Sequence, residues 1–394
     1  MRTRALSTPC PACGAGELRP VHREAGVPVH SCLLFDTAQA AQALATGRIE
    51  LGLCGRCGFV SNMAFDPAAM RYGERYEETQ GYSATFRAFH ERLATALEGW
   101  AGVAGRRVLE IGCGKGEFLA LLAQRGAAAL HGFDPAYRAG RLAIPAGADF
   151  RVETRLFPPP EGPVAADLVV CKMTLEHIPA PLEFLKAVRA AVRWGRGGKL
   201  LLMVPDAERI WASAAFEDVY HEHCSYFTRA ALAASLACAG FAVEHLAREY
   251  GEQYLIALAS PSRGAKPAPV QADQAVLEDA ASFSRRRAAA IEEWRAQLAA
   301  AGAGRTALWG SGSKAVAFLS ACRPGGAVLG AVDINPHRHG ARIPPQGHRI
   351  LAGSELAGSG VGRVVAMNAI YRREIRASLD ALGLDGVRLD ALRA

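Results

Sequence analysis

The sequence predicts an α/β protein in which a small metal-binding module precedes two Rossmann-like units. Three observations predict this fold class: two CxxC pairs lie in the first 66 residues, and a hydrophobic run followed by glycines and a helical pattern occurs at 106–126 and again at 305–322. A short apolar run, a glycine turn and a helix are typical of one unit of a parallel sheet. At roughly 150 residues per domain, 394 residues have room for two or three domains. We expect three, covering 1–66, 67–262 and 263–394.

The composition describes an ordinary globular protein and argues against one class of partner. Half of the residues are hydrophobic, and the formal net charge is +7. The basic residues are scattered, with Arg285–Arg287 as the one triple, whereas a nucleic-acid surface clusters them among aromatic residues. We therefore expect a small-molecule partner and no nucleic acid. The oligomeric state stays open, and a monomer is compatible with the sequence.

The N-terminal sequence gives no export signal. The segment "MRTRALSTPCPACG" has no apolar core before a cleavage site, and no apolar run in the chain reaches about 18 residues. We expect a cytoplasmic protein with no membrane partner, in which thiols stay reduced. Where its ten cysteines occur in pairs, they therefore indicate metal binding rather than disulfides.

The two CxxC pairs predict a structural zinc site. They comprise Cys10 and Cys13 in "CPACG", and Cys54 and Cys57 in "CGRCG". The glycine after each second cysteine relieves the turn that directs two thiolates at one ion. Four thiolates leave no open coordination position, so such a zinc ion stabilises the fold and does not take part in catalysis. A redox pair or an iron–sulfur cluster is the alternative.

Two further residues between the pairs could ligate a metal. They are His30 and Cys32, and an ordinary buried or surface role is the favoured interpretation for each.

The segment "RRVLEIGCGKGEFLALLAQRG" predicts a strand, a glycine loop and a helix. Val108–Ile111 is the apolar run of a buried parallel strand, and Glu117–Gln124 is helical. Such loops serve phosphates, adenosines and plain turns alike. The chain has no GxxxxGK[ST] motif, so the sequence does not predict a triphosphate site. The loop glycines are Gly112, Gly114 and Gly116.

Two acidic residues near this loop indicate more specifically which ligand it binds. Glu110 precedes it, and Asp134 ends the next predicted strand in "LHGFDPA", where a carboxylate can accept hydrogen bonds from ribose hydroxyls. A third strand, Leu168–Cys171, is followed by Thr174–His177 at its carboxyl end, where open α/β sheets bind ligands. A nicotinamide dehydrogenase is the alternative, but the third small residue of its GxGxxG motif is absent.

The order of these motifs over residues 103–202 resembles that of class I S-adenosylmethionine-dependent methyltransferases. The resemblance implies that the GCGKG loop binds the methionine and ribose side of S-adenosylmethionine. It also implies that the carboxylate after the second strand binds the ribose diol. The implied cofactor-binding residues are Glu110, Gly112, Gly114, Gly116 and Asp134.

The C-terminal third predicts a second Rossmann-like unit. A Pro-, Ala- and Gly-rich linker at 259–274 leads into a long helix, Ala275–Ala301. In the next strand–turn–helix segment, Gly310–Lys314 could cradle a phosphate at a helix N-terminus, with Lys314 as counter-charge. A purely structural repeat of the fold is an equal alternative. Asp333 ends the strand after that turn, as the earlier aspartate does in the first unit.

The stretch "DVYHEHCSYFT", Asp218–Thr228, leaves a metal site, an acid–base set and coincidence open. It lacks the spacing of a zinc motif such as HExxH. In an extended strand, His221 and His223 would share one face, while Tyr220 and Glu222 would share the other. A contact between the glutamate and a histidine would then need a loop or a helical bend.

The order of cysteine pairs, methyltransferase core, "HEH" segment and "WGSGSK…VDINP" unit resembles that of three-domain sugar C-methyltransferases. This family methylates C3 of nucleotide-linked 4-keto deoxysugars in deoxysugar and natural-product biosynthesis. The resemblance covers essentially the whole chain. It implies a zinc-binding N-terminal domain, a methyl-donor domain and a C-terminal Rossmann-like domain that together enclose one active site.

The resemblance also implies a set of active-site residues. His223 in "YHEHCSYFT" matches the catalytic histidine of the family, with Glu222 and Tyr220 beside it. His177 in "TLEHIP" and Tyr76 in "RYEETQGYSATFR" match a second active-site histidine and a tyrosine. C-methylation beside a ketone needs a base for the C–H proton and a donor for the enolate oxygen. We expect the histidine at 223 to be the base, oriented by the glutamate, with a tyrosine or the second histidine as donor.

Two other functions stay open. The segments "RYEETQGYSATFR" and "MNAIYRREI" depart from the sugar enzymes, so an O- or N-methyltransferase of another small molecule is the first alternative. Such an enzyme starts from a lone pair and needs only one base. The second alternative is a non-catalytic, zinc-containing binding protein with a vestigial core. The intact acidic residues and GCGKG loop argue against it.

Overall fold

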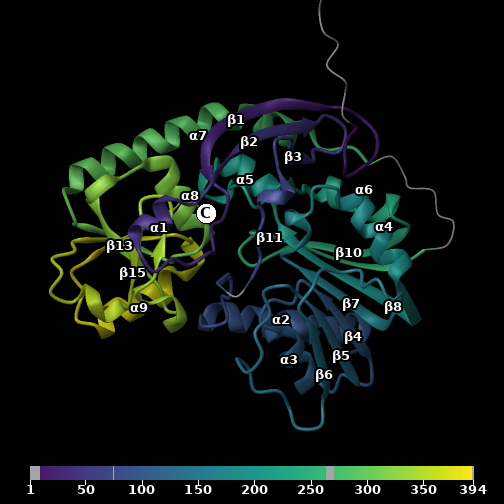
Figure 1. Cartoon of the computed structure of the whole chain (residues 1–394). Coiled ribbons are helices and arrows are strands. Elements are labelled where there is room, and N and C mark those ends of the chain that lie inside the picture. The colour runs from purple at the N-terminus through teal and green to yellow at the C-terminus, as the bar shows by residue number, and fades with distance from the viewer. Residues whose placement is uncertain (1–8, 74, 263–269, 393–394) are drawn as a thin grey trace, which may run out of the picture.

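The computed structural model describes residues 9–73, 75–262 and 270–392. Over these residues it confirms the predicted α/β fold class, with three sheets and helices packed against them (Figure 1). Part of the predicted linker, 263–269, lies outside the described residues. The predicted domain boundaries stay predictions. No helix among the described residues is long and apolar enough to cross a membrane.

The central unit is a seven-stranded sheet with the strand order of a Rossmann fold. Its strands are β4 (Arg107–Ile111), β5 (Ala129–Phe133), β6 (Asp149–Glu153), β7 (Val164–Lys172), β8 (Val192–Pro205), β10 (Phe241–Glu249) and β11 (Tyr254–Pro261). They are ordered β10-β11-β8-β7-β4-β5-β6. The five strands from β6 to β8 are parallel and follow the order 3-2-1-4-5 along the chain. β11 is antiparallel to both of its neighbours.

Helices cover both faces of this sheet, as side-chain alternation in the strands requires. One face carries α2 (Ala84–Ala101) and α3 (Glu117–Gln124), and the other carries α4 (Pro181–Ala191) and α6 (Arg229–Cys238). In β7, Leu168 and Val170 pack toward α2 and α3, while Val169 packs toward α4 and α6. The near-continuous apolar strands predicted from sequence are therefore buried on both sides.

The N-terminal segment forms a four-stranded sheet that is completed from the central unit. The strands are β1 (Leu18–Pro28), β2 (Thr46–Cys54), β3 (Val60–Asn62) and β9 (Ser225–Tyr226), in that order. The helices α5 (Ala207–Ser213) and α7 (Gln274–Ala301) share a core with this sheet, and the short helix α1 (Ala38–Gln42) lies between β1 and β2 in the chain. Figure 1 shows α7 running alongside β1 toward the C-terminal unit. The helix expected at 275–301 is confirmed.

The C-terminal unit is a second sheet of Rossmann order. Its strands are β12 (Thr306–Trp309), β13 (Val328–Val332), β14 (Arg342–Ile343), β15 (His348–Leu351), β16 (Arg363–Ala366) and β17 (Arg388–Ala391). They are ordered β14-β15-β13-β12-β16-β17 and are parallel except for β14. The helices α8 (Ser313–Cys322) and α9 (Arg372–Ala381) pack on opposite faces. Loops at the carboxyl ends of both parallel sheets line one pocket between the two units.

Candidate active site

The four paired cysteines converge on one point. The Sγ atoms of Cys10 and Cys57 lie 3.7 Å apart, and those of Cys13 and Cys54 lie 4.0 Å apart. Tetrahedral zinc with Zn–S bonds of about 2.3 Å would place its sulfurs about 3.8 Å apart. The donor set therefore fits a closed zinc site with four thiolate ligands. All four ligand atoms lie within 4.8 Å of one another.

This cluster is joined to the central unit. The backbone N–H of Leu182 in α4 donates to the carbonyl of Pro11 at 3.1 Å. The hydroxyl of Thr228 donates to the carbonyl of Cys57 at 2.8 Å. Three of the four cysteines share a core with the apolar side chains of α4 and α6. The cysteine cluster thus packs on the central unit and fixes the start of the segment that continues toward the pocket.

The predicted glycine loop connects β4 and α3. Gly112, Gly114 and Gly116 have φ values of 70°, 54° and 84°, in the left-handed region that glycine adopts without strain. Lys115 between them is buried. Its ammonium group donates to the carbonyl of Tyr76 at 3.0 Å and to the carbonyl of Ala136, after β5, at 2.9 Å. The lysine therefore ties the 76–80 segment to the loop.

The two predicted cofactor carboxylates lie at the ends of β4 and β5. Glu110 is buried and pairs with Lys172, and burial, opposed by this lysine, raises its pKa. Asp134 accepts hydrogen bonds from the N–H groups of Gly114 at 2.8 Å and Ala136 at 2.7 Å. Burial raises its pKa as well. A carboxylate has about four acceptor positions, so Asp134 can still accept from a ribose hydroxyl.

Gly112→Ala should weaken S-adenosylmethionine binding at least about tenfold. A Cβ at Gly112 would lie 2.0 Å from Oγ1 of Thr174, so the loop or the segment after β7 must move. A left-handed non-glycine residue also costs about 1–2 kcal/mol. Titration calorimetry measures the effect. The matched control is Gly105→Ala, which has a φ of 74° but open space at its Cβ position. Equal cofactor affinity in the two variants would contradict the steric argument.

The structure brings His223, Tyr220 and His177 together. The hydroxyl of Tyr220 lies 2.7 Å from Nε2 of His223, and the two imidazole rings stack edge to face at 4.9 Å. Burial, assisted by the neighbouring histidine, holds the pKa of His223 well below its ordinary value. Burial also lowers the pKa of His177 and raises that of Tyr220. A neutral imidazole beside a protonated phenol is the arrangement that a base and a donor require.

The expected orientation of His223 by Glu222 is wrong. Residues 221 and 222 form a turn, and the Glu222 carboxylate accepts hydrogen bonds from His30 at 2.8 Å and from the N–H of Ser31 at 3.0 Å. Burial opposes its ionisation, but the hydrogen bonds from His30 and Ser31 help to keep its pKa below the ordinary value. Glu222 therefore holds the N-terminal segment, and Tyr220 is the observed partner of His223.

Tyr76 lies beside this group and outside the lining of the pocket. Its ring contacts Tyr72 at a centroid distance of 5.2 Å and His30 at 6.2 Å. Tyr72 in turn places its hydroxyl 3.4 Å from Nδ1 of His177. Burial raises the pKa of Tyr76. The aromatic cluster packs behind the second histidine.

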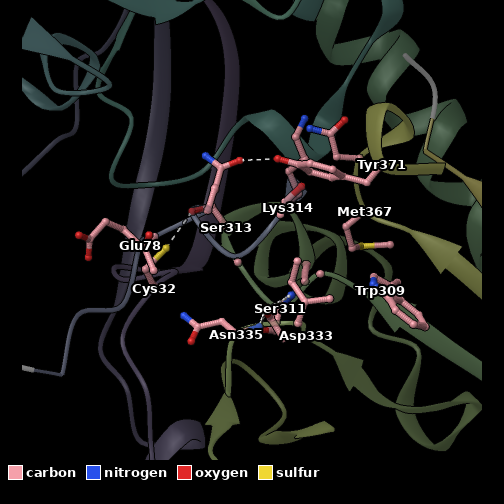
Figure 2. A pocket seen from close by; sticks show the side chains of 18 of the residues that line it. Cys32, Glu78, Trp309, Ser311, Ser313, Lys314, Asp333, Asn335, Met367 and Tyr371 are labelled. Atoms are coloured by element: carbon pink, nitrogen blue, oxygen red, sulfur yellow. Dashed lines mark hydrogen bonds between the residues drawn. The ribbon is translucent and has the colours of Figure 1, made fainter. Parts of the chain in front are cut away.

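The pocket between the two Rossmann-like units carries His223 and Tyr220 on its wall. Figure 2 shows Cys32 and Ser313 together on one side, with Met367 and Trp309 at the other. Lys314, expected as a phosphate counter-charge, instead pairs with Asp218 at 2.6 Å. Asp333 accepts a hydrogen bond from the N–H of Ser311 at 3.0 Å.

Sequence reasoning missed the roles of several residues of this site. His30 and Cys32, possible zinc ligands by their position, instead contact Glu222 and Ser313. Glu176 is a buried carboxyl whose pKa burial raises to about 8. It stands next to His177 in "TLEHIP", but nothing in those letters shows burial. The contacts of His30 and Cys32 join segments far apart in sequence, so no local pattern predicts them.

Residues 82–246 match a protein-family model that is described as a methyltransferase domain. The ubiquinone biosynthesis O-methyltransferase of Pseudomonas aeruginosa (strain LESB58) is 35% identical over 108 residues, which is 26% of this chain and 45% of that protein. The protein of the same name from Paracidovorax citrulli (strain AAC00-1) is 31% identical over 142 residues, which is 33% of this chain and 59% of that protein. The chain spans about half the length of these curated relatives.

Two solved structures are also similar to part of the chain. A putative S-adenosylmethionine dependent methyltransferase from Listeria monocytogenes is 15% identical with a TM-score of 0.36, covering 45% of this chain and 100% of that one. The 1,6-didemethyltoxoflavin-N1-methyltransferase of Burkholderia thailandensis, with bound S-adenosylhomocysteine, is 21% identical with a TM-score of 0.36. The match covers 46% of this chain and 83% of that one.

Proposed function

Because the chain contains a class I S-adenosylmethionine-dependent methyltransferase domain, we propose that it is a C-methyltransferase of a nucleotide-linked keto-deoxysugar. The observation that carries the proposal is the neutral His223, paired with the Tyr220 hydroxyl, on the wall of a pocket between two Rossmann-like units. A base and a hydroxyl donor side by side suit a carbon acid next to a carbonyl.

The residues divide the reaction in a simple way. Because Nε2 of His223 faces the Tyr220 hydroxyl, Nδ1 of His223 would take the proton from the carbon beside the substrate carbonyl. The Tyr220 hydroxyl would accept a hydrogen bond from Nε2–H and donate one to the oxygen on which negative charge develops. Bound S-adenosylmethionine supplies the electrophilic methyl group. The substrate carbon forms the new C–CH3 bond as the S–CH3 bond breaks, and S-adenosylhomocysteine leaves. The enzyme contributes mainly the in-line position of the two reactants.

The cofactor would lie at the carboxyl ends of β4 and β5. The loop glycines allow close approach of a ligand to the backbone, and Asp134 has acceptor positions left for the ribose. Glu110 and Lys172 form a buried pair beneath the loop. We assign Glu110, Gly112, Gly114, Gly116 and Asp134 to the cofactor site.

The nucleotide part of the substrate would use the C-terminal unit. Gly310–Ser313 leads into the N-terminus of α8, where backbone N–H groups favour phosphate oxygens. Lys314 is already paired with Asp218, so the helix N-terminus and the guanidinium of Arg338, which also lines the pocket, would supply the positive charge. The aromatic rings of Trp309 and Tyr371 in the same lining suit a base or a sugar face.

The cysteine cluster would hold a structural zinc ion. Its four thiolates fit a closed tetrahedral site, and it anchors the segment that brings His30 and Ser31 to Glu222. Zinc chemistry at this cluster is not part of the methyl transfer.

An O-methyltransferase is the second candidate, favoured by the names of the curated relatives. One assay separates the two candidates from each other. The protein is incubated with methyl-labelled S-adenosylmethionine and a panel of nucleotide-linked 4-keto sugars, and products are identified by mass spectrometry. We expect label in a sugar carbon. Label on oxygen or nitrogen would favour the second candidate, and cofactor binding without any product would turn the search to other substrates.

A further inference from the structure

Glu176 is a buried carboxyl group that the proposed reaction does not use. It lies in the short turn Leu175–His177 after β7, with 1% of its surface exposed. No described residue donates a hydrogen bond to either of its side-chain oxygens. Keeping a carboxylate away from water without a partner is costly, so such a group stays protonated unless a cation takes the place of the proton, and its unpartnered oxygens are available to one.

Two imidazoles face this carboxyl group. One ligand atom from each of Glu176, His177 and His223 lies within 4.8 Å of the others. Each ring is also hydrogen-bonded to a tyrosine: Tyr220 at Nε2 of His223, and Tyr72 at Nδ1 of His177. Partners of this kind hold metal-binding imidazoles in a fixed orientation. The three side chains therefore converge, and a tyrosine helps to orient each imidazole.

We propose that Glu176, His177 and His223 bind a first-row divalent transition-metal cation. Two imidazoles and one carboxylate are a common donor set for these ions, and three protein ligands leave coordination positions open to solvent or substrate oxygen. Metal–ligand bonds of about 2.0–2.2 Å bring ligand atoms to roughly 3.0–3.6 Å of one another. Since the three atoms already lie within 4.8 Å, the set has to close by at most about 1–2 Å on binding.

This site is separate from the cysteine cluster in residues and in chemistry. The two sets share no side chain. Soft thiolates select zinc, whereas carboxylate and imidazole ligands accept harder ions such as Mn²⁺. An ion can reach the set from the pocket, because His223 is part of its lining. Manganese is therefore a probe that distinguishes the two sites.

Binding of a cation at this site has one consequence for methyl transfer, and this consequence rests on the proposed function. When Nδ1 of neutral His223 binds the cation, Nε2 carries the ring proton and donates to the Tyr220 hydroxyl oxygen, so the ring has no lone pair left to accept a substrate proton. Cation binding and base catalysis then exclude each other. Divalent cations of this class should inhibit methyl transfer in proportion to the occupancy of the site.

The test is Mn²⁺ binding by the full-length protein, followed by electron paramagnetic resonance of the free ion. A mild chelator first removes loosely bound metal, and the zinc content is measured in parallel. We expect one equivalent of Mn²⁺ in the wild type, and affinity at least about tenfold lower in Glu176→Gln. The matched control is Glu217→Gln, which alters another buried carboxyl outside the set. It should bind Mn²⁺ as the wild type does.

Two results would overturn the site: no stoichiometric Mn²⁺ in the wild type, or equal affinity in Glu176→Gln. If that variant does not fold, cobalt in the wild type decides the question. Bound Co²⁺ that shows only thiolate charge-transfer bands would then count against the site. The activity assay separates this inference from the proposed function, because activation by bound Mn²⁺ would keep the site and overturn the base role of His223.

Discussion

His223→Ala should lower the turnover number by about two to four orders of magnitude, which is the usual contribution of a general base. The affinity for S-adenosylmethionine should stay nearly unchanged, because the pocket lining that contains His223 includes neither the loop glycines nor Asp134. Steady-state kinetics with a sugar that serves as substrate, together with titration calorimetry of the cofactor, measure both quantities.

The matched control for this variant is His221→Ala. His221 is also buried and lies two residues away, but its ring packs against Phe65 and the backbone of Gly47, outside the pocket lining. We expect a loss of stability and little change in turnover per folded molecule. Wild-type turnover in His223→Ala, or an equal loss in both variants, would exclude His223 as the base.

Cys57→Ser should abolish stoichiometric zinc and unfold the N-terminal segment. Structural zinc sites contribute on the order of 10 kcal/mol of apparent binding free energy, and losing one thiolate removes most of it. Cys57 is fully buried in the core shared with α4 and α6, so the loss extends into the central unit. Metal analysis and thermal unfolding measure the effect. Turnover should fall with it, since His30 and Ser31 belong to the same segment.

Cys322→Ser provides the control for thiol loss alone. Cys322 is buried in the core of the C-terminal unit and is not a member of the cysteine cluster. We expect it to retain the zinc ion and to lose at most about 1–3 kcal/mol of stability from the buried hydroxyl. A Cys57→Ser protein that keeps its zinc and the melting temperature of the wild type would contradict the structural role of the cluster.

Sequence patterns predicted those helices and strands that depend only on residues close together in the chain. The helix Glu117–Gln124, the strand before the glycine loop and the long helix after the linker each depend on periodicity within one segment. The cysteine pairs could also be predicted from the sequence, because each CxxC turn directs its two thiolates toward one point without help from the rest of the chain. The apolar runs of the strands also predicted burial on both faces of the central sheet.

The contacts of the candidate site could not be predicted in this way. Glu222 accepts from His30, 192 residues earlier in the chain, and Lys314 pairs with Asp218 at the wall of the pocket. These pairs depend on how the N-terminal sheet and the C-terminal unit pack on the central one. The pattern "HEH" suggested that neighbours in sequence act on each other, whereas the turn at 221–222 directs the Glu222 carboxylate to His30 and Ser31.

The fate of the α-hydrogen during methyl transfer separates C-methylation from transfer to a heteroatom. A nucleotide-linked 4-keto sugar carrying deuterium beside its carbonyl is incubated with the protein and S-adenosylmethionine, and the product is analysed by mass spectrometry against a sample without protein. We expect each product molecule to gain one methyl group and to lose that deuterium. A product that gains the methyl group and retains the deuterium would contradict C-methylation and the assignment of His223 as its base.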